Sequence, residues 1–359
     1  MNRRALLIAA VLTVLTACGQ TPATPETQEA AADAAKPLRK VRFLLNSGFS
    51  GANAWFLLAD ERGYFRREGI EIEFTPGRGA FTAAGRMVGE GFDVGYGDIQ
   101  AVYEQAATVP GKSPVGVYMM MDRSPSVIIL PARSPVRSAD QLEGRTITGH
   151  ATDVALNTFA QYAKVAGVDP ASVRIGTNEG NWKELLALMD SGKTEALFGY
   201  LSTSSAAVRT AGQDVGARLR FLRYSEMLPD FYGSVVMVSP KLLREEPAIA
   251  RGLVSAINQG VIDTLCDPDA AIQALVKRDP KQNPVVERGR LRDTMIEDMG
   301  GVDMINRGVG DIERPRVLAA LKLTAEARKL PRTPTVEEVF ERGLLPPLEE
   351  RQPCPVHLR

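Results

Sequence analysis

Along the first half of the chain, segments in which apolar and polar residues alternate, as in strands, take turns with segments in which apolar residues recur with the period of a helix. Residues 70–74, Ile-Glu-Ile-Glu-Phe, alternate strictly, which is typical of a strand with one buried face. Runs of this kind are separated by segments of helical period and by turn signals such as Asn46-Ser47-Gly48. The predicted order is strand, helix, strand, helix, strand and helix, over 41–45, 54–62, 70–74, 82–90, 93–96 and 98–107. This alternation predicts a mostly parallel sheet covered by helices.

A second cycle with the same order follows the first. We expect its strands over 146–148, 173–175 and 196–198 and its helices over 153–166, 182–191 and 202–211. Strand-like runs flank this cycle, and the chain beyond Pro240 is mainly helical. The sequence therefore predicts an α/β fold of two lobes with a helical C-terminal segment. One lobe is expected to comprise 39–128 and 222–359, and the other 129–221. The tail after Pro331 has apolar anchors that predict packing on a lobe: Val336, Val339, Phe340, Leu344 and Leu345.

The first residues have the anatomy of a secretory signal. A basic start, Asn2-Arg3-Arg4, precedes an apolar run over 5–17, which is shorter than the roughly 20 residues that a membrane-spanning helix needs. The run ends in Leu15-Thr16-Ala17-Cys18, which resembles the lipobox of bacterial lipoproteins. The resemblance implies a signal peptide over 1–17 and a lipidated Cys18 that anchors an extracytoplasmic protein to a bacterial membrane, in the periplasm or at the cell surface. An ordinary secretory signal with a chance cysteine is the alternative.

Composition narrows the class of protein. Residues 18–38 are rich in Ala, Thr, Pro, Glu and Gln and contain no aromatic residue, so we expect a flexible tether there. The rest of the chain is long enough for two lobes, and the hydrophobic content of 44% fits a protein with a real core. Lys and Arg number 43, as do Asp and Glu, and this absence of a basic excess argues against nucleic-acid binding.

The cysteines and histidines carry little sign of a metal centre. With two histidines and no Cys-x-x-Cys pair, we expect neither a metal site nor a cofactor. An extracytoplasmic location permits a disulfide between Cys266 and Cys354. Two unpaired thiols remain the alternative, because the sequence does not give the distance between these residues.

Four segments carry a resemblance to a known family. The chain has ADERGYFRREGI at 59–70, VGEGFDVG at 88–95, ADQLEGRTI at 139–147 and MDSGKTEA at 189–196. In order and spacing, from about residue 41 to about residue 271, they resemble the substrate-binding proteins of bacterial ABC importers. The branch concerned takes up thiamine-type pyrimidines, riboflavin, alkylsulfonates and nitrate. Glu195 stands where that family usually has Asp.

The resemblance implies a fold, a function and a set of partners. The expected fold is the two-lobed type II fold of periplasmic binding proteins, without catalytic activity. A small-molecule solute would be held between the lobes by hinge closure about 120–130 and 221–238. The protein would then dock, as a monomer, on a permease and its ATPase, with the lipid anchor as its contact with the membrane.

Ligands of open α/β sheets bind beyond the carboxyl ends of the strands, and these ends supply the candidate ligand-binding residues. Aromatic residues near them are expected to form stacking walls: Phe49, Trp55, Tyr96, Trp182, Tyr200 and Tyr232. The candidate polar and charged groups are Asn46, Arg78, Asp98, His150, Asp153 and Asn181. Several of these candidates also have a purely structural alternative. Asp98 and Asp153 precede helices and fit N-caps, Trp182 fits a core, and Arg78 and His150 fit solvated loops.

The charge at these strand ends bears on the class of solute. Arg78 is the only cation there, against the acids Asp98, Asp153, Glu179 and Asp230. That balance disfavours a small anion and favours a neutral or weakly basic ring such as a pyrimidine, a thiamine precursor or a flavin. The alternatives are a sulfonate- or nitrate-type anion receptor and a non-transport lipoprotein sensor. An enzyme of the pyrimidine-synthase type is disfavoured, because the resemblance would imply a cysteine-rich iron-binding loop that this sequence lacks.

Overall fold

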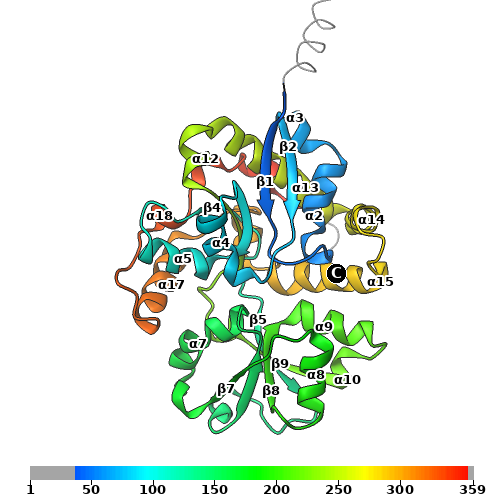
Figure 1. Ribbon diagram of the computed structural model, residues 1–359, viewed down its shortest axis with the longest axis vertical. Coiled ribbons are helices and arrows are strands. Elements are labelled where there is room, and N and C mark those ends of the chain that lie inside the picture. Colours follow the sequence, from blue (N-terminus) through cyan, green and yellow to red (C-terminus); the bar gives the residue numbers. More distant parts are fainter. Residues whose placement is uncertain (1–36, 355–359) are drawn as a thin grey trace, which may run out of the picture. The chain divides into compact units, whose positions relative to one another are not determined.

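The computed structural model describes residues 37–354, and the chain from Leu38 onward forms one compact unit. The signal, most of the tether and Cys18 lie outside the described residues. Two five-stranded sheets, sheet A and sheet B, form the framework of this unit (Figure 1). None of the helices described between residues 37 and 354 is long and apolar enough to span a membrane.

Sheet A has the strand order β2-β1-β3-β10-β4. β1 pairs in parallel with β2 and β3, whereas β10 is antiparallel to both β3 and β4. The strands are β1 (Arg39–Leu44), β2 (Ile70–Thr75), β3 (Val94–Asp98), β4 (Val115–Met119) and β10 (Ser234–Val238). Around them lie α2 (Ala54–Glu61), α3 (Tyr64–Arg67), α4 (Ala83–Glu90), α5 (Ile99–Thr108), α12 (Pro240–Glu245), α13 (Pro247–Cys266) and α14 (Pro268–Arg278).

Sheet B repeats the arrangement in the order β7-β6-β8-β5-β9. β6 is parallel to β7 and β8, and β5 is antiparallel to β8 and β9. The strands are β5 (Ser126–Pro131), β6 (Thr146–Gly149), β7 (Arg174–Thr177), β8 (Ala196–Tyr200) and β9 (Leu219–Arg223). The helices are α6 (Val154–Asn157), α7 (Phe159–Ala166), α8 (Trp182–Asp190), α9 (Leu201–Thr210), α10 (Val215–Arg218) and α11 (Tyr224–Met227).

The prediction of an α/β fold with two mostly parallel sheets flanked by helices is confirmed. The predicted strands and helices coincide with observed ones, apart from shifts of their ends. One helix expected over 153–166 is broken at Thr158, where α6 ends and α7 begins. The Thr158 hydroxyl donates to the Val154 carbonyl at 2.7 Å, a back-bond that competes with regular helix geometry.

The C-terminal segment comprises α15 (Pro284–Asp293), a π-helical turn over Thr294–Asp298, α16 (Val302–Arg307), α17 (Arg314–Ala327) and α18 (Val336–Val339). It contacts helices of both sheets, since α15 packs against α9 and α17 packs against α5 and α7. Val336, Val339, Phe340 and Leu344 are buried, so the tail packs through the anchors expected of it. The backbone N–H of Glu341 donates to the Gly116 carbonyl of β4 at 2.8 Å. The tail therefore covers the outer edge of sheet A, which would otherwise offer unpaired backbone groups.

A disulfide and a buried arginine fix the end of this tail. Cys266, at the last position of α13, is bonded to Cys354, with a Cα–Cα distance of 5.4 Å. The guanidinium of Arg351 donates to the carbonyls of Arg307 and Val309 at 2.7 and 3.0 Å. A cross-link over 88 residues removes conformational freedom mainly from the unfolded chain.

We predict that the double variant Cys266→Ser/Cys354→Ser folds but is less stable than the wild type by about 2–4 kcal/mol. The fold survives because the apolar anchors and Arg351 still hold the tail. Urea unfolding of both proteins measures the difference, and wild type in a reducing agent should reproduce the variant. Equal stability of the oxidised wild type and the double variant would show that the cross-link contributes nothing.

Candidate functional site

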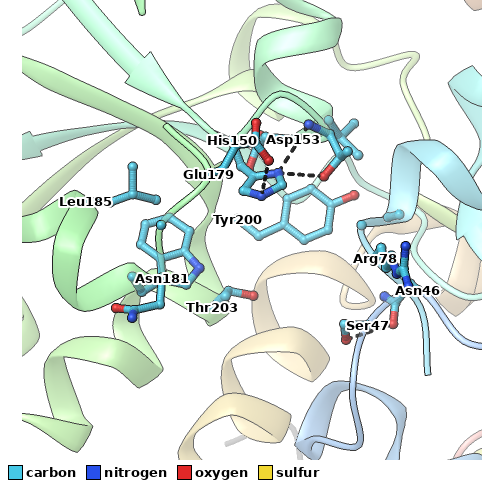
Figure 2. Close-up of a pocket in the computed structure, with 16 residues that line it drawn as sticks. Asn46, Ser47, Arg78, His150, Asp153, Glu179, Asn181, Leu185, Tyr200 and Thr203 are labelled. Carbon is cyan, nitrogen blue, oxygen red and sulfur yellow. Dashed lines mark hydrogen bonds and ion pairs between the residues drawn. The ribbon is translucent and has the colours of Figure 1, made fainter. Parts of the chain in front are cut away.

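A cavity of about 520 Å³ lies where the carboxyl ends of strands from both sheets face each other. Figure 2 shows its labelled side chains converging from separate loops and helix starts. Sheet A contributes the loops after β1 and β2, and sheet B contributes the ends of β6, β7 and β8. The lining residues are Asn46, Ser47, Arg78, Gly79, Ala80, His150, Thr152, Asp153, Val154, Glu179, Gly180, Asn181, Trp182, Leu185, Tyr200 and Thr203.

On the sheet A side, backbone hydrogen bonds join the two lining loops. The Gly79 N–H donates to the Asn46 carbonyl at 2.9 Å, and the Gly77 N–H donates to the Ser47 carbonyl at 3.0 Å. A side chain at Gly77 would collide with the Leu45 carbonyl, so this close approach requires glycine. The loops present Asn46 and the exposed Arg78 to the cavity, and the Arg78 guanidinium has no ion pair among residues 37–354.

On the sheet B side, His150 is held between two partners. Its Nε2 lies 2.9 Å from Glu179 Oε2, and its Nδ1 lies 2.8 Å from Thr152 Oγ1. Asp153 caps α6 by accepting from the Ala155 N–H at 2.7 Å. Burial of the Asp153 carboxyl raises its pKa to about 6. These groups line one wall of the cavity and offer hydrogen-bond acceptors to a solute.

Trp182 is both a core residue and a wall of the cavity. It is the first residue of α8, whose N-cap Asn181 accepts from the Lys183 and Glu184 N–H groups at 3.0 and 3.2 Å. The indole packs over Gly199 of β8, where any side chain would collide with it. The ring remains partly exposed and lines the cavity. The amide oxygen of Asn181 is engaged in the cap, so its part in ligand binding is small.

Tyr200 bridges the two sheets. It ends β8 and lines the cavity, and its hydroxyl donates to Asp98 Oδ2 at 3.2 Å. Asp98 ends β3, is 1% exposed and caps α5 by accepting from the Gln100 N–H at 3.0 Å. Burial raises the pKa of Asp98 to about 7, because it outweighs the two hydrogen bonds, which lower the pKa. Asp98 is therefore a cap and an inter-sheet partner behind the cavity wall.

Seven of the predicted ligand-binding residues line the cavity: Asn46, Arg78, His150, Asp153, Asn181, Trp182 and Tyr200. That they bind a solute stays a prediction. The expectation of six aromatic walls needs correction, because only Trp182 and Tyr200 of that set line it.

The other predicted aromatic residues are engaged elsewhere. Trp55 and Tyr96 are buried in the core of sheet A, and Phe49 packs partly buried against that core. Tyr232 is buried, with its hydroxyl bonded to Asp303 and its ring under the Arg316 guanidinium. Their positions near strand ends did not show which way the side chains turn.

Sequence reasoning did not select several lining side chains as ligand-binding candidates: Ser47, Thr152, Leu185 and Thr203. Leu185 had a usable signal, since it lies three residues after Trp182 on the same face of α8. Thr152 and Thr203 had none, because small hydroxyl residues occur throughout loops and helix starts. Among the described residues no group of three or more His, Cys, Asp or Glu side chains is placed to hold a metal ion.

A family model described as NMT1/THI5 like matches residues 52–271. The chain is 23% identical over 265 residues to the riboflavin-binding protein RibY of Chloroflexus aurantiacus, covering 73% of this chain and 74% of RibY. It is 22% identical over 251 residues to the 4-amino-5-hydroxymethyl-2-methylpyrimidine phosphate synthase of Legionella pneumophila, covering 67% of this chain and 74% of the synthase.

Among solved structures, the alkanesulfonate-binding protein SsuA of Xanthomonas axonopodis pv. citri, bound to MOPS, superimposes with a TM-score of 0.63. The identity is 16%, and the alignment covers 86% of this chain and all of SsuA. This likeness concerns the fold, and it confirms the expected two-lobed fold of periplasmic binding proteins.

The buried carboxyl of Asp98 predicts a pH dependence of stability. Between about pH 4 and pH 7 the unfolded chain has released this proton while the folded protein keeps it, so stability falls as the pH rises, by up to about 1.4 kcal/mol per pH unit. Asp98→Asn keeps a residue that caps helices and abolishes this titration. Urea unfolding across that range should show a smaller loss of stability in the variant. Parallel curves for the two proteins would contradict the assignment.

Proposed function

The chain belongs to the NMT1/THI5-like family, and from that premise we propose that it is the solute-binding protein of an ABC importer. The observation that carries this proposal is the cavity itself. Its walls are the carboxyl ends of parallel strands from two sheets, which is where open α/β sheets bind ligands. Two connections join the sheets, between β4 and β5 and between β9 and β10, and they allow a hinge motion that closes the lobes on a solute.

The proposed solute is a small heteroaromatic compound of the pyrimidine, thiamine-precursor or flavin type. The rings of Trp182 and Tyr200 line the cavity and can stack on a flat ligand, and a volume of about 520 Å³ accommodates one. Asp153 and Glu179 supply acceptors for ring nitrogens and amino groups. The name of RibY and that of the pyrimidine synthase both concern ring compounds of this kind.

An anionic solute is the second candidate. The observation in its favour is the exposed guanidinium of Arg78, which lines the cavity without an ion pair among the described residues. A sulfonate or nitrate could pair with it. Against this, Glu179 and Asp153 lie on the facing wall, and an anion would have to approach both.

The residues of the cavity favour binding over catalysis, although one relative is an enzyme. Within residues 37–354 the cavity is lined by no cysteine and no lysine, two residue types that commonly act as nucleophiles. Cys266 and Cys354 are joined in a disulfide. His150 is held by Glu179 and Thr152, an arrangement that suits the orientation of a ligand.

The proposed setting is extracytoplasmic, with lipidated Cys18 as the anchor to a bacterial membrane. Cys18 and its preceding apolar run lie outside the described residues, and the support for the anchor is the signal anatomy of the sequence. The proposed partners are a permease and its ATPase, which receive the solute from a monomer of this protein.

The solute class is tested by titrating the purified body of the protein, from Arg39 onward, with riboflavin, the aminopyrimidine of the synthase relative, taurine and nitrate. We predict binding of a ring compound, and a loss of affinity of about tenfold in Trp182→Ala, because a stacked ring contributes roughly 1 kcal/mol or more. The control is Phe49→Ala, which truncates an aromatic residue outside the cavity and should leave the affinity unchanged. Isothermal titration calorimetry measures all three proteins.

The anion alternative gives a different result in the same titration. Taurine or nitrate alone would bind, and Arg78→Gln rather than Trp182→Ala would abolish the binding. If no compound of the panel bound the wild type, transport of these solutes would be rejected and the sensor alternative favoured.

Anchoring is tested on the full chain. We predict that the wild type sediments with membranes and incorporates labelled fatty acid, whereas Cys18→Ala does neither, because the acyl chains supply the membrane affinity. Cys266→Ser/Cys354→Ser is the control and should remain with the membrane. A Cys18→Ala variant that stayed membrane-bound would favour an ordinary signal sequence with another means of attachment.

A further inference from the structure

Four buried polar atoms close to the cavity have no hydrogen-bond partner among residues 37–354. They are Tyr96 Oη, Ser126 Oγ, Ser234 Oγ and Asp298 Oδ2. The first three side chains are fully buried, and Asp298 is 2% exposed. Buried polar groups without partners are rare in folded proteins, because each costs about 1–3 kcal/mol, so a group of them calls for a physical explanation.

Strand register brings the serines to the Asp98–Tyr200 contact. Ser234 of β10 stands directly opposite Asp98 of β3, and Ser126 of β5 stands directly opposite Tyr200 of β8. Opposite residues of antiparallel strands project from the same face. The Tyr200 hydroxyl reaches Asp98, so both serines lie beside the point where the two sheets meet.

Tyr96 and Asp298 lie on the sheet A side of the same region. Tyr96 precedes Asp98 by two residues in β3, so the two side chains share one face of the sheet. The backbone carbonyl of Asp298 accepts from the Arg123 N–H at 3.1 Å, which places Asp298 beside the connection that leads into β5. Asp298 ends a π-helical turn, a feature that often occurs at functional sites.

Tyr200 separates this region from the open cavity. Its ring lines the cavity, whereas its hydroxyl donates to Asp98 Oδ2 at 3.2 Å. Because this hydroxyl contacts Asp98, the residue that stands opposite Ser234, the Tyr200 side chain lies between the cavity lining and the unpartnered groups. We call this region, formed by Tyr96, Asp98, Ser126, Ser234 and Asp298, the inner chamber.

We propose that the inner chamber is the second compartment of the ligand site, and that the solute inserts a hydroxyl-bearing arm there while its ring stays between Trp182 and Tyr200. The arm takes the place of the Asp98–Tyr200 contact and provides partners for the hydroxyls of Tyr96, Ser126 and Ser234. This inference rests on the proposed function and adds the chemistry of one part of the solute.

The lining groups favour an uncharged arm over an anionic one. Asp98 and Asp298 both belong to the chamber, and a phosphate or carboxylate would face these two carboxyl groups. The guanidinium of Arg123, whose backbone N–H contacts Asp298, donates to the Gly300 carbonyl at 2.8 Å. A hydroxyl both donates and accepts, and therefore matches serine, tyrosine and carboxyl partners alike.

The test compares two pairs of probes that share a ring and differ in the arm. The first pair is riboflavin and lumiflavin, which has the same isoalloxazine ring and a methyl group in place of the hydroxylated chain. The second is the aminopyrimidine of the synthase relative and its analogue with a methyl group in place of the hydroxymethyl group. Each is titrated into wild type, Ser234→Ala, Tyr96→Phe and Trp182→Ala, and the melting temperature of each free protein is recorded.

We expect Ser234→Ala and Tyr96→Phe each to weaken the hydroxylated probe of one pair by about tenfold and to leave the probe without the arm unchanged. The free variants should melt no lower than the wild type, since the hydroxyls removed have no partner to lose. Tyr103→Phe is the matched control. It removes another buried, unpartnered hydroxyl, on α5 and outside the chamber, and should not change the affinity.

The outcomes separate this inference from the proposed function. The receptor function stands if Trp182→Ala weakens binding. The chamber does not hold the arm if Ser234→Ala and Tyr96→Phe leave the affinity for both probes of a pair unchanged, or if they weaken the two probes equally. If either variant melts lower without a change in affinity, its hydroxyl is structural and the inference is wrong. If the wild type binds no probe, the proposed function fails and the chamber inference fails with it.

Discussion

The exchange of one strand between the two sheets is the constraint on which the rest of the structure depends. After β4 the chain leaves sheet A, and its next strand, β5, enters sheet B antiparallel to β8. After β9 the chain returns, and β10 enters sheet A antiparallel to β3. Each exchanged strand lies between two strands that run antiparallel to it, β10 between β3 and β4 and β5 between β8 and β9. The carboxyl ends of the parallel strands of the two sheets face each other at the cavity. The cavity follows from this topology, since the loops after the parallel strands have no other place to gather.

The same exchange produces an internal correspondence at the centre of the molecule. Each exchanged strand begins with a serine, and each serine stands opposite the residue that ends a central parallel strand. These two end residues, Asp98 and Tyr200, are hydrogen-bonded to each other. The chain thus places polar groups at a position where both sheets meet, although burial there is unfavourable for them. A purely structural junction would have been more stable with apolar residues, which is why a ligand is the simpler explanation of their presence.

The sequence was sufficient to predict the strands, helices and loops of the cavity, because turn signals such as Asn46-Ser47-Gly48 mark strand ends and hydrophobic period marks helices. It was not sufficient to predict which aromatic residues face the cavity. Tyr96 lies inside a strand whose two faces are both buried, so alternation gave no direction for its side chain. Trp55 lies in α2, which is buried nearly all round, and the helical period therefore showed no exposed face. For Trp182 the sequence left core and cavity open as alternatives, and the structure combines them, because one ring packs on Gly199 and also lines the cavity.

Stabilising contacts elsewhere in the fold offset the free-energy cost of burying this polar centre. The tail that carries Phe340, Arg351 and Cys354 closes the free edge of sheet A far along the chain from the cavity residues. It thus adds apolar burial, buried hydrogen bonds and a covalent constraint without contributing to the cavity lining. A receptor that opens and closes must keep each lobe folded while the contacts between lobes remain weak enough to exchange for a ligand. The fixed tail satisfies the first requirement. The contacts to be exchanged are polar: the hydrogen bond from Tyr200 to Asp98 and the ion pairs Arg209–Asp293 and Arg223–Glu297.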